Sequence, residues 1–192
     1  MPPLVGAFCF IIHASRAQTV TIEQTGESGW YSLINYTDPM MGFTMYQELG
    51  QTFTTSYPMH LQSLGFRTPF VEQAGSVIVE IYASDNMETF TTLLATTLPF
   101  PVSPEWTTIP VDNLNITLEQ GKVYGFKIKP QTGLKTNIFS YALKTYNAGY
   151  SYAFNNGSTY RLGDDLNFRV IGTIASVAAY SQAQTSGTSL KL

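Results

Sequence analysis

The feature that most constrains how this chain can fold is an alternation of apolar and polar side chains with a period of two. In the stretch "VYGFKIKP", Tyr124, Phe126 and Ile128 alternate with Lys127 and Lys129. Successive side chains of an extended strand point to opposite faces, so this stretch has one apolar and one polar face. Burial of a single face is typical of antiparallel sheets, and we predict such a strand here.

Two further stretches, "SVIVEIYAS" and "DLNFRVIG", repeat this alternation. The residues that it predicts to point inward are Val77, Val79, Ile81, Leu166, Phe168 and Val170. Those that it predicts to point outward include Glu80, Tyr82, Asn167 and Arg169. Many of these residues are β-branched or aromatic, which suits the pleated, half-buried surface of a sheet.

Turn-forming sequences such as "SDN", "EQGK" and "NNGS" separate other short segments of strand character. These segments are 19–24, 50–55, 61–68, 93–98, 107–111, 137–143 and 151–154. Many short strands with turns between them indicate an all-β sandwich or barrel. No long amphipathic helix is predicted, and we interpret "DPMMGFTMYQEL" as a loop.

Composition excludes some partners. Charged residues make up only 12% of the 192 residues, and the formal net charge is -3. Proteins that bind nucleic acid usually carry a basic patch, so we expect no nucleic-acid partner, and charge gives no attraction to an anionic membrane. No segment reaches the roughly 20 apolar residues that a spanning helix needs, and we predict no membrane span.

The N-terminal sequence resembles a secretory signal peptide. An apolar run from Leu4 to Ile12 precedes small residues at Ser15 and Ala17, the pattern of a cleavage site. We predict a signal peptide over residues 1–17 and a secreted product, extracellular or periplasmic; the alternatives are a buried first strand or a misassigned start codon. The single cysteine, Cys9, lies in this segment, so a mature chain would have no disulfide framework.

A resemblance to known proteins rests on five segments. In order they are "GQTFTTSYPMHLQSLGFRT", "GSVIVEIYASDN", "TLLATTLPFP", "WTTIPVDNLNITLEQGKVYGFKIKP" and "DLNFRVIGT". Together they resemble bacterial extracellular β-sandwich modules of jelly-roll type, similar to carbohydrate-binding modules. The resemblance implies an antiparallel two-sheet β-sandwich of jelly-roll type, which we place over residues 18–174 as a single domain. The small, polar stretch 175–192 is predicted to be a flexible tail.

The chain offers little catalytic chemistry. His60 is the only histidine outside the predicted signal peptide, and no G-x-S-x-G sequence is present. A glycoside hydrolase needs two carboxyl groups about 5 to 10 Å apart, yet Glu80 is the only acid on its expected strand. We therefore predict that the protein is not an enzyme, and glycoside hydrolysis is the least favoured function.

One acidic pair raises the question of a metal. Modules of the type that the chain resembles often carry structural Ca²⁺, which takes oxygen ligands. Asp164 and Asp165 are adjacent, and Asp38 or Glu23 could join them to form a calcium site. The alternative is that "GDD" is an ordinary turn before a strand. No other cofactor is expected.

Aromatic and amide residues gather between Tyr146 and Asp165. Flat rings pack on the C–H faces of sugars, while amides and hydroxyls bind the sugar hydroxyls. The residues that we predict to bind a ligand are Trp30, Tyr31, Tyr146, Tyr150, Tyr152, Asn155, Asn156, Tyr160 and Arg161. Trp30 is expected in a loop before the sandwich. If 151–154 is a strand, Tyr150, Tyr152 and Phe154 share one face, which either forms a sugar platform or packs in the core.

Two functions therefore compete. The first is a secreted, non-catalytic binding module that recognises neutral glycans through loop aromatics and amides. The second is a structural or adhesive cell-surface protein that acts through contacts with an extracellular protein. A shallow aromatic groove would favour the first function, and a large flat apolar patch would favour the second.

Overall fold

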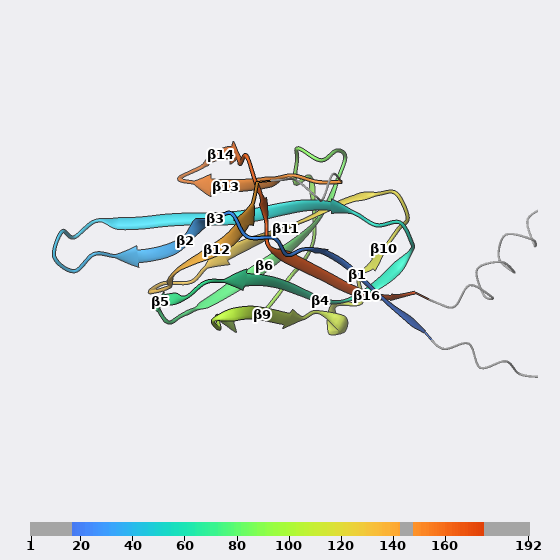
Figure 1. Ribbon diagram of the computed structural model, residues 1–192, viewed down its shortest axis with the longest axis horizontal. Helices are drawn as coiled ribbons and strands as arrows, with labels where there is room; N and C mark the ends of the chain where they lie inside the picture. Colours follow the sequence, from blue (N-terminus) through green and yellow to red (C-terminus); the bar gives the residue numbers. More distant parts are fainter. Residues whose placement is uncertain (1–16, 143–147, 175–192) are drawn as a thin grey trace, which may run out of the picture. The chain divides into compact units, whose positions relative to one another are not determined.

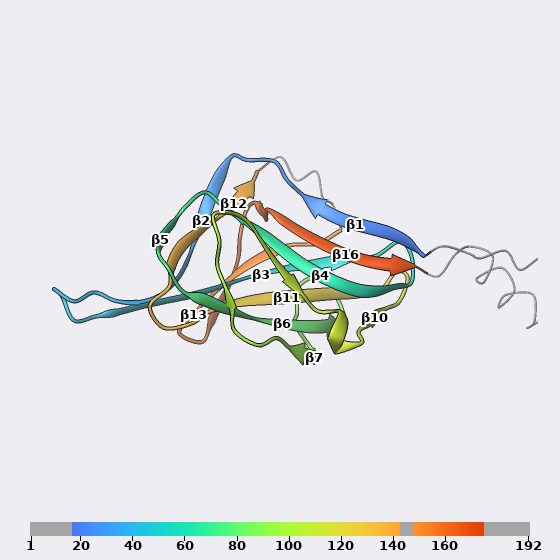
Figure 2. The same ribbon diagram turned by 90° about the horizontal axis from the view of Figure 1, so that it is seen from below.

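Two antiparallel β-sheets form the protein, as the alternating pattern predicts (Figure 2). The computed structural model describes residues 17–142 and 148–174. Thr19–Ile174 forms one compact unit. The second unit consists of Met1–Gln18 and Ala175–Leu192, and the structure describes only residues 17 and 18 of it. The predicted signal peptide, except residue 17, and the predicted tail therefore lie outside the described residues.

The smaller sheet has the strand order β1-β16-β4, with β9 and β10 both paired to β4. Its strands are β1 (Gln18–Gln24), β4 (Met59–Thr68), β9 (Glu105–Pro110), β10 (Thr117–Leu118) and β16 (Phe168–Ile174). A short 3-10 helix, η1 (Asp112–Leu114), follows β9.

The larger sheet has the order β15-β12-β2-β3-β11-β6-β7, with four short strands attached to it. The strands on the main path are β2 (Gly29–Thr37), β3 (Thr44–Thr54), β6 (Ser76–Ser84), β7 (Thr92–Thr96), β11 (Val123–Pro130), β12 (Lys135–Tyr141) and β15 (Asp165–Leu166). The attached strands are β5 (Val71–Gln73), β8 (Phe100–Pro101), β13 (Ser151–Asn155) and β14 (Ser158–Arg161). In the described parts of the chain, no helix has the length and apolarity needed to cross a bilayer.

The core lies between the two sheets. Phe126 of β11 contacts Phe168 of β16 across the interface, with ring centroids 5.9 Å apart. The inward-facing residues predicted from the three alternating stretches are all buried. This confirms the two-sheet β-sandwich. The chain passes from the larger sheet at β3 to the smaller sheet at β4 and returns to the larger sheet at β5.

One predicted orientation is wrong. Asn167 was expected to point outward, but it is fully buried. It lies at the junction of β15 and β16, where its N–H donates to the Phe139 carbonyl at 2.8 Å and its carbonyl accepts from the Arg67 N–H at 3.2 Å. Asn167 thus forms backbone hydrogen bonds with both sheets. The alternation of buried and exposed side chains is interrupted at this residue.

Strand β3 is shared by three partners. β11 pairs with its residues 49–54 on one edge. On the opposite edge, β2 pairs with residues 44–47 and β13 pairs with residues 48–51. The larger sheet therefore divides at β3 into a β2–β12 branch and a β13–β14 branch.

The β2–β3 hairpin runs beyond the neighbouring strands to the loop Asp38–Phe43 (Figure 1, left). The stretch expected to be a loop is one only as far as Phe43, because β3 begins at Thr44. Trp30, expected in a loop, belongs to strand β2. The early start of β3 was not predicted, because the mostly polar residues of Thr44–Glu48 show no alternation of apolar and polar side chains.

Candidate functional site

The outer face of the larger sheet carries a charged network. Lys129 of β11 donates a hydrogen bond to Glu80 of β6 at 2.9 Å, and its Nζ lies 3.9 Å from Glu48 of β3. The Tyr82 hydroxyl donates to Glu80 at 2.6 Å, and the Tyr46 hydroxyl donates to Glu48. Two tyrosine–glutamate pairs thus flank one ammonium group.

The network sets the protonation of its members. Burial alone would raise the pKa of Glu80, but hydrogen bonds from Tyr82 and Lys129 and the lysine charges outweigh it and lower that pKa. The hydrogen bond to Glu80 raises the pKa of Lys129 against the effect of burial. Burial and the neighbouring carboxylates raise the pKa values of Tyr46 and Tyr82. At neutral pH, Glu80 is therefore an anion and Lys129 a cation.

A second lysine of the same strand has a different environment. The Lys127 Nζ lies 4.3 Å from the ring centroid of Phe154 and 5.1 Å from those of Tyr82 and Phe90. Burial lowers the pKa of Lys127, although the carboxylates of the network oppose this effect. The rings favour the ammonium form through cation–π attraction, so we regard Lys127 as a cation held by aromatic faces.

Phe90 is the centre of the aromatic group. Its ring lies edge-on to Tyr82, Tyr152 and Phe154, with centroid separations of 5.6, 5.6 and 5.4 Å. Two glycines give it room on the sheet, because a Cβ at Gly125 or Gly50 would come within 2.7 or 3.2 Å of this ring. The aromatic group therefore depends on strand positions without side chains.

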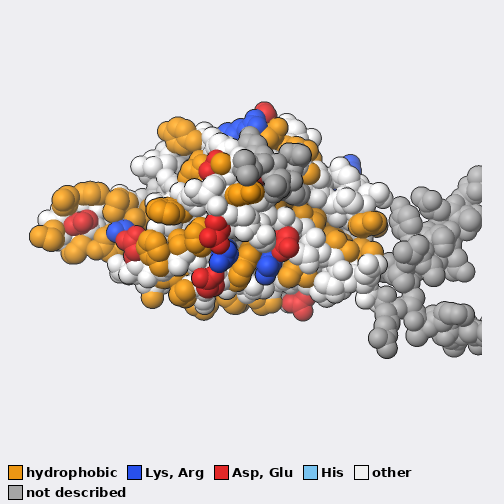
Figure 3. Space-filling model, in the orientation of Figure 1, with side chains coloured by type: hydrophobic (Ala, Val, Ile, Leu, Met, Phe, Trp, Pro, Cys, Tyr) orange, Lys and Arg blue, Asp and Glu red, His pale blue; other side chains and the backbone are white. Residues whose placement is uncertain are grey.

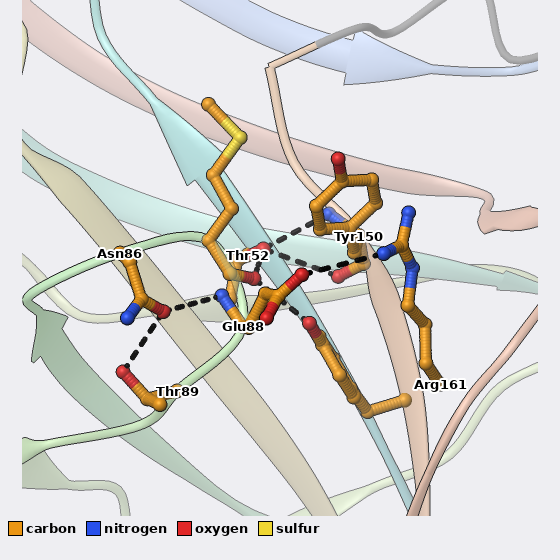
Figure 4. Close-up of polar contacts among 8 residues, drawn as sticks. Thr52, Asn86, Glu88, Thr89, Tyr150 and Arg161 are labelled. Atoms are coloured by element: carbon orange, nitrogen blue, oxygen red, sulfur yellow. Dashed lines mark hydrogen bonds and ion pairs between the residues drawn. The ribbon is translucent and has the colours of Figure 1, made fainter.

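Polar contacts hold the loop that carries Phe90 (Figure 4). The hydroxyls of Thr52 and Tyr152 both donate to the Met87 carbonyl at 2.9 Å. Glu88 of the same loop forms an ion pair of 3.5 Å with Arg161 of β14. These contacts attach residues 85–91 to β3 and to the β13–β14 hairpin.

A depression with a volume of about 240 Å³ lies between the β13–β14 hairpin and strands β3 and β11. It is lined by Tyr46, Glu48, Lys127, Phe154, Asn156, Gly157, Ser158 and Thr159. Asn156 and Gly157 have φ values of 45° and 83°, which form the tight turn that makes one wall. The depression combines two aromatic side chains with an amide, two hydroxyls and one charge of each sign.

The predicted residues of β13 and β14 take different places. Asn156 lines the depression, and Asn155 and Tyr160 are exposed on the same hairpin. Tyr152 is buried under the loop 85–91, so the face that it shares with Phe154 packs against Phe90. Burial raises the pKa of Tyr152.

Arg161, also predicted to bind a ligand, stacks on Tyr150 with its guanidinium carbon 3.4 Å from the ring centroid. This stack and the ion pair with Glu88 make Arg161 part of the support of the site. Tyr146 lies outside the described residues.

Trp30 and Tyr31 do not lie at the depression. They are consecutive in β2 and therefore point to opposite faces. Trp30 pairs with Phe139 of β12 and is 59% exposed, whereas Tyr31 packs against the core. Burial and the charge of Asp164 raise the pKa of Tyr31. The two residues thus belong to the β2–β12 branch, away from the pairing of β13 with β3.

The acidic pair has separate partners. Asp165 is buried and accepts a hydrogen bond from Gln51 at 3.3 Å, while Asp164 accepts one from Ser140 at 3.2 Å. Asp38 caps the hairpin loop, and Glu23 pairs with Arg169 at 2.7 Å. Within residues 17–142 and 148–174, no three acidic, histidine or cysteine side chains gather as a metal site.

The sequence did not predict three of the residues that line the depression. Lys127 lies on the outer face of β11, which the alternation does predict. Tyr46 and Glu48 lie in the first half of β3, which it does not predict. Which outer faces meet depends on the order β3-β11-β6, and no local pattern specifies that order.

No protein-family model matches the chain, and no curated protein matches it. One similar structure contains the cysteine protease and lectin-like domains of Cwp84, a surface layer associated protein of Clostridium difficile: TM-score 0.43, 15% identity, over 69% of this chain and 33% of that one. Another is infectious bursal disease virus Gt strain: TM-score 0.31, 12% identity, over 96% of this chain and 54% of that one. The chain thus spans about a third and about half of these two chains.

Proposed function

We propose that the protein is a secreted, non-catalytic binding module that holds a glycan in the depression on the larger sheet. The observation that supports this most is the composition of the depression: the side chains of Tyr46 and Phe154 lie beside Asn156, Ser158 and Thr159. Rings can stack on a sugar while the amide and hydroxyls bind its hydroxyl groups. The volume is below the roughly 300–1,000 Å³ of drug-sized sites, which suits one sugar unit of a longer chain.

The charges in the depression are compatible with an uncharged ligand. Glu48 accepts from the Tyr46 hydroxyl and lies near Lys129, and Lys127 lies against the aromatic rings. Because each charge already has an internal partner, a ligand does not have to supply one.

A hydrolytic role has one observation in its favour. Glu48 and Glu80 both approach the Lys129 nitrogen, at 3.9 and 2.9 Å, so their nearest oxygens are at most about 7 Å apart, which does not exceed the range of glycosidase carboxyl pairs. A glycosidase also needs one of the pair protonated at neutral pH. The pKa of Glu80 is lowered, so Glu80 does not suit the acid role.

Binding to a broad panel of immobilised glycans, followed by calorimetry with each positive, tests the proposal. Tyr46→Ala should weaken binding about tenfold or more, if loss of the stacking ring costs as much as the roughly 1–3 kcal/mol measured for nucleic-acid bases on aromatic side chains. Tyr57→Ala is the matched control, because Tyr57 is an exposed tyrosine at the β3–β4 turn. Equal affinities of the Tyr46 variant and the wild type would place the ligand elsewhere, and no binding to any glycan would reject the ligand class.

A further inference from the structure

The loop at the end of the β2–β3 hairpin exposes an unusual set of apolar side chains. Met40 is 95% exposed, Met41 74% and Phe43 48%. Figure 3 shows hydrophobic side chains gathered over this end of the molecule (left), around one acidic group. Exposed apolar side chains that lie together commonly mark a binding surface. We call residues 38–43 the apex.

The apex has a well-defined structure. One carboxylate oxygen of Asp38 accepts from the N–H groups of Met40 and Met41 at 2.8 and 2.9 Å. The Asp38 carbonyl accepts from the Gly42 N–H at 2.8 Å, and Gly42 has a φ of 70°. The loop therefore presents its methionines from a fixed backbone.

These bonds leave the loop backbone with no free donor between residues 39 and 42. Pro39 has no N–H, and the three N–H groups that follow all have acceptors inside the loop. The hydrocarbon of a bilayer offers no acceptor to a free N–H group, so the satisfied donors lower the cost of moving the loop from water toward lipid.

Polar and amphipathic side chains follow the apex along the hairpin. The hydroxyls of Thr37 and Thr44 bond to each other at 2.8 Å across the hairpin. Tyr36 follows, paired across the hairpin with Met45. An amphipathic tyrosine next to an apolar end suits the interface between hydrocarbon and headgroups.

Charge selects the kind of lipid. Residues 29–47 contain no Lys or Arg, and their only acidic residue is Asp38. Nothing in the hairpin attracts an anionic headgroup, so a bilayer with no net charge is the partner that fits.

From these observations we propose that the apex inserts Met40, Met41 and Phe43 into the interface of a neutral phospholipid bilayer. Insertion would reach the roughly 5–10 Å depth of interfacial elements without any segment crossing the membrane. The proposal is independent of the ligand of the depression.

Flotation of the protein with phosphatidylcholine vesicles tests this inference. The double variant Met40→Ser, Met41→Ser should partition at least about tenfold more weakly than the wild type, because burying one methionine side chain corresponds to roughly a tenfold change or more. Leu98→Ser is the matched control, since Leu98 is 85% exposed outside the apex, and should partition like the wild type. Thermal unfolding of each variant checks that the fold is intact.

A Met41→Trp variant gives a second measurement that does not depend on loss of binding. Its additional fluorescence should shift to the blue with phosphatidylcholine vesicles and be quenched by lipids brominated on the acyl chain. Three results would overturn the proposal: no flotation of the wild type, equal loss for Leu98→Ser, or binding that requires phosphatidylserine. So would a lipid-free dimer that the double variant abolishes, because the occupant would then be a second copy of the chain.

Discussion

Replacing Gly125 by alanine tests how the aromatic group on the larger sheet is held. The new Cβ would lie 2.7 Å from Cε1 and 3.0 Å from Cδ1 of Phe90, and 3.3 Å from Cγ2 of Thr52. Carbon atoms in contact prefer separations of about 3.5–4.0 Å, so the ring has to retreat by about 1 Å. That retreat opens the edge-to-face contacts of Phe90 with its three neighbouring rings.

The size of the effect follows from these contacts. Each aromatic pair contributes about 0.5–1.5 kcal/mol beyond area burial, and overpacking typically costs about 1–3 kcal/mol. Because Phe90 is only half-buried, we expect a loss in the middle of these ranges, a fall in the free energy of unfolding of about 2 kcal/mol. For a domain of this size, that corresponds to a decrease in Tm of about 4–8 °C.

Urea unfolding followed by circular dichroism measures this change. Gly163→Ala is the control, because a Cβ at Gly163 meets no atom within 4 Å, and its free energy of unfolding should change little. A double-mutant cycle with Phe90→Ala identifies the cause. If the clash is with Phe90, Gly125→Ala should have almost no further effect in the Phe90→Ala background; additive losses would refute this account.

Three shorter predictions concern the same face. Asn156→Ala should destabilise the protein by about 1 kcal/mol by unfolding assays, because a Cβ-bearing residue without a local hydrogen bond is unfavourable at φ 45°, whereas Asn156→Gly should not. Tyr152→Phe removes the hydrogen bond to the Met87 carbonyl and should lower the free energy of unfolding by about 1 kcal/mol in urea titrations. The lowered pKa of Glu80 stabilises the fold above its ordinary value of 4.5, and this contribution is lost as pH falls through the lower folded value. Glu80→Gln should therefore reduce the decrease in Tm measured below pH 4.5; an unchanged decrease would mean that Tyr82 and Lys129 do not stabilise the carboxylate.

Much of the fold follows from local pattern. In β6 and β11 the alternation assigns inner and outer faces as the structure has them, because both strands bury one face against the smaller sheet. It fails at Asn167, whose backbone bonds join two sheets. It also fails for the first half of β3, which leaves the core as part of the hairpin and so has no apolar period to detect.

The candidate site is less accessible to sequence reasoning. Asn156 could be found because Asn-Asn-Gly-Ser is a turn sequence and an amide at a turn tip is exposed. Glu48 and Glu80 could not, since they are 32 positions apart and meet only through Lys129 of the strand between them. Tyr152 shows the reverse difficulty, because a strand pattern cannot predict that a loop 61 to 67 residues earlier covers the ring.

The continuity of β3 also fixes a distance. Phe43 of the apex and Glu48 of the depression lie about 17 Å apart along one extended segment, at roughly 3.4 Å per residue. A molecule attached through its apex would thus hold its depression within two nanometres of the lipid. Sugars on short headgroups of the same leaflet would come within reach, whereas those at the end of long polymers would have to bend back to it.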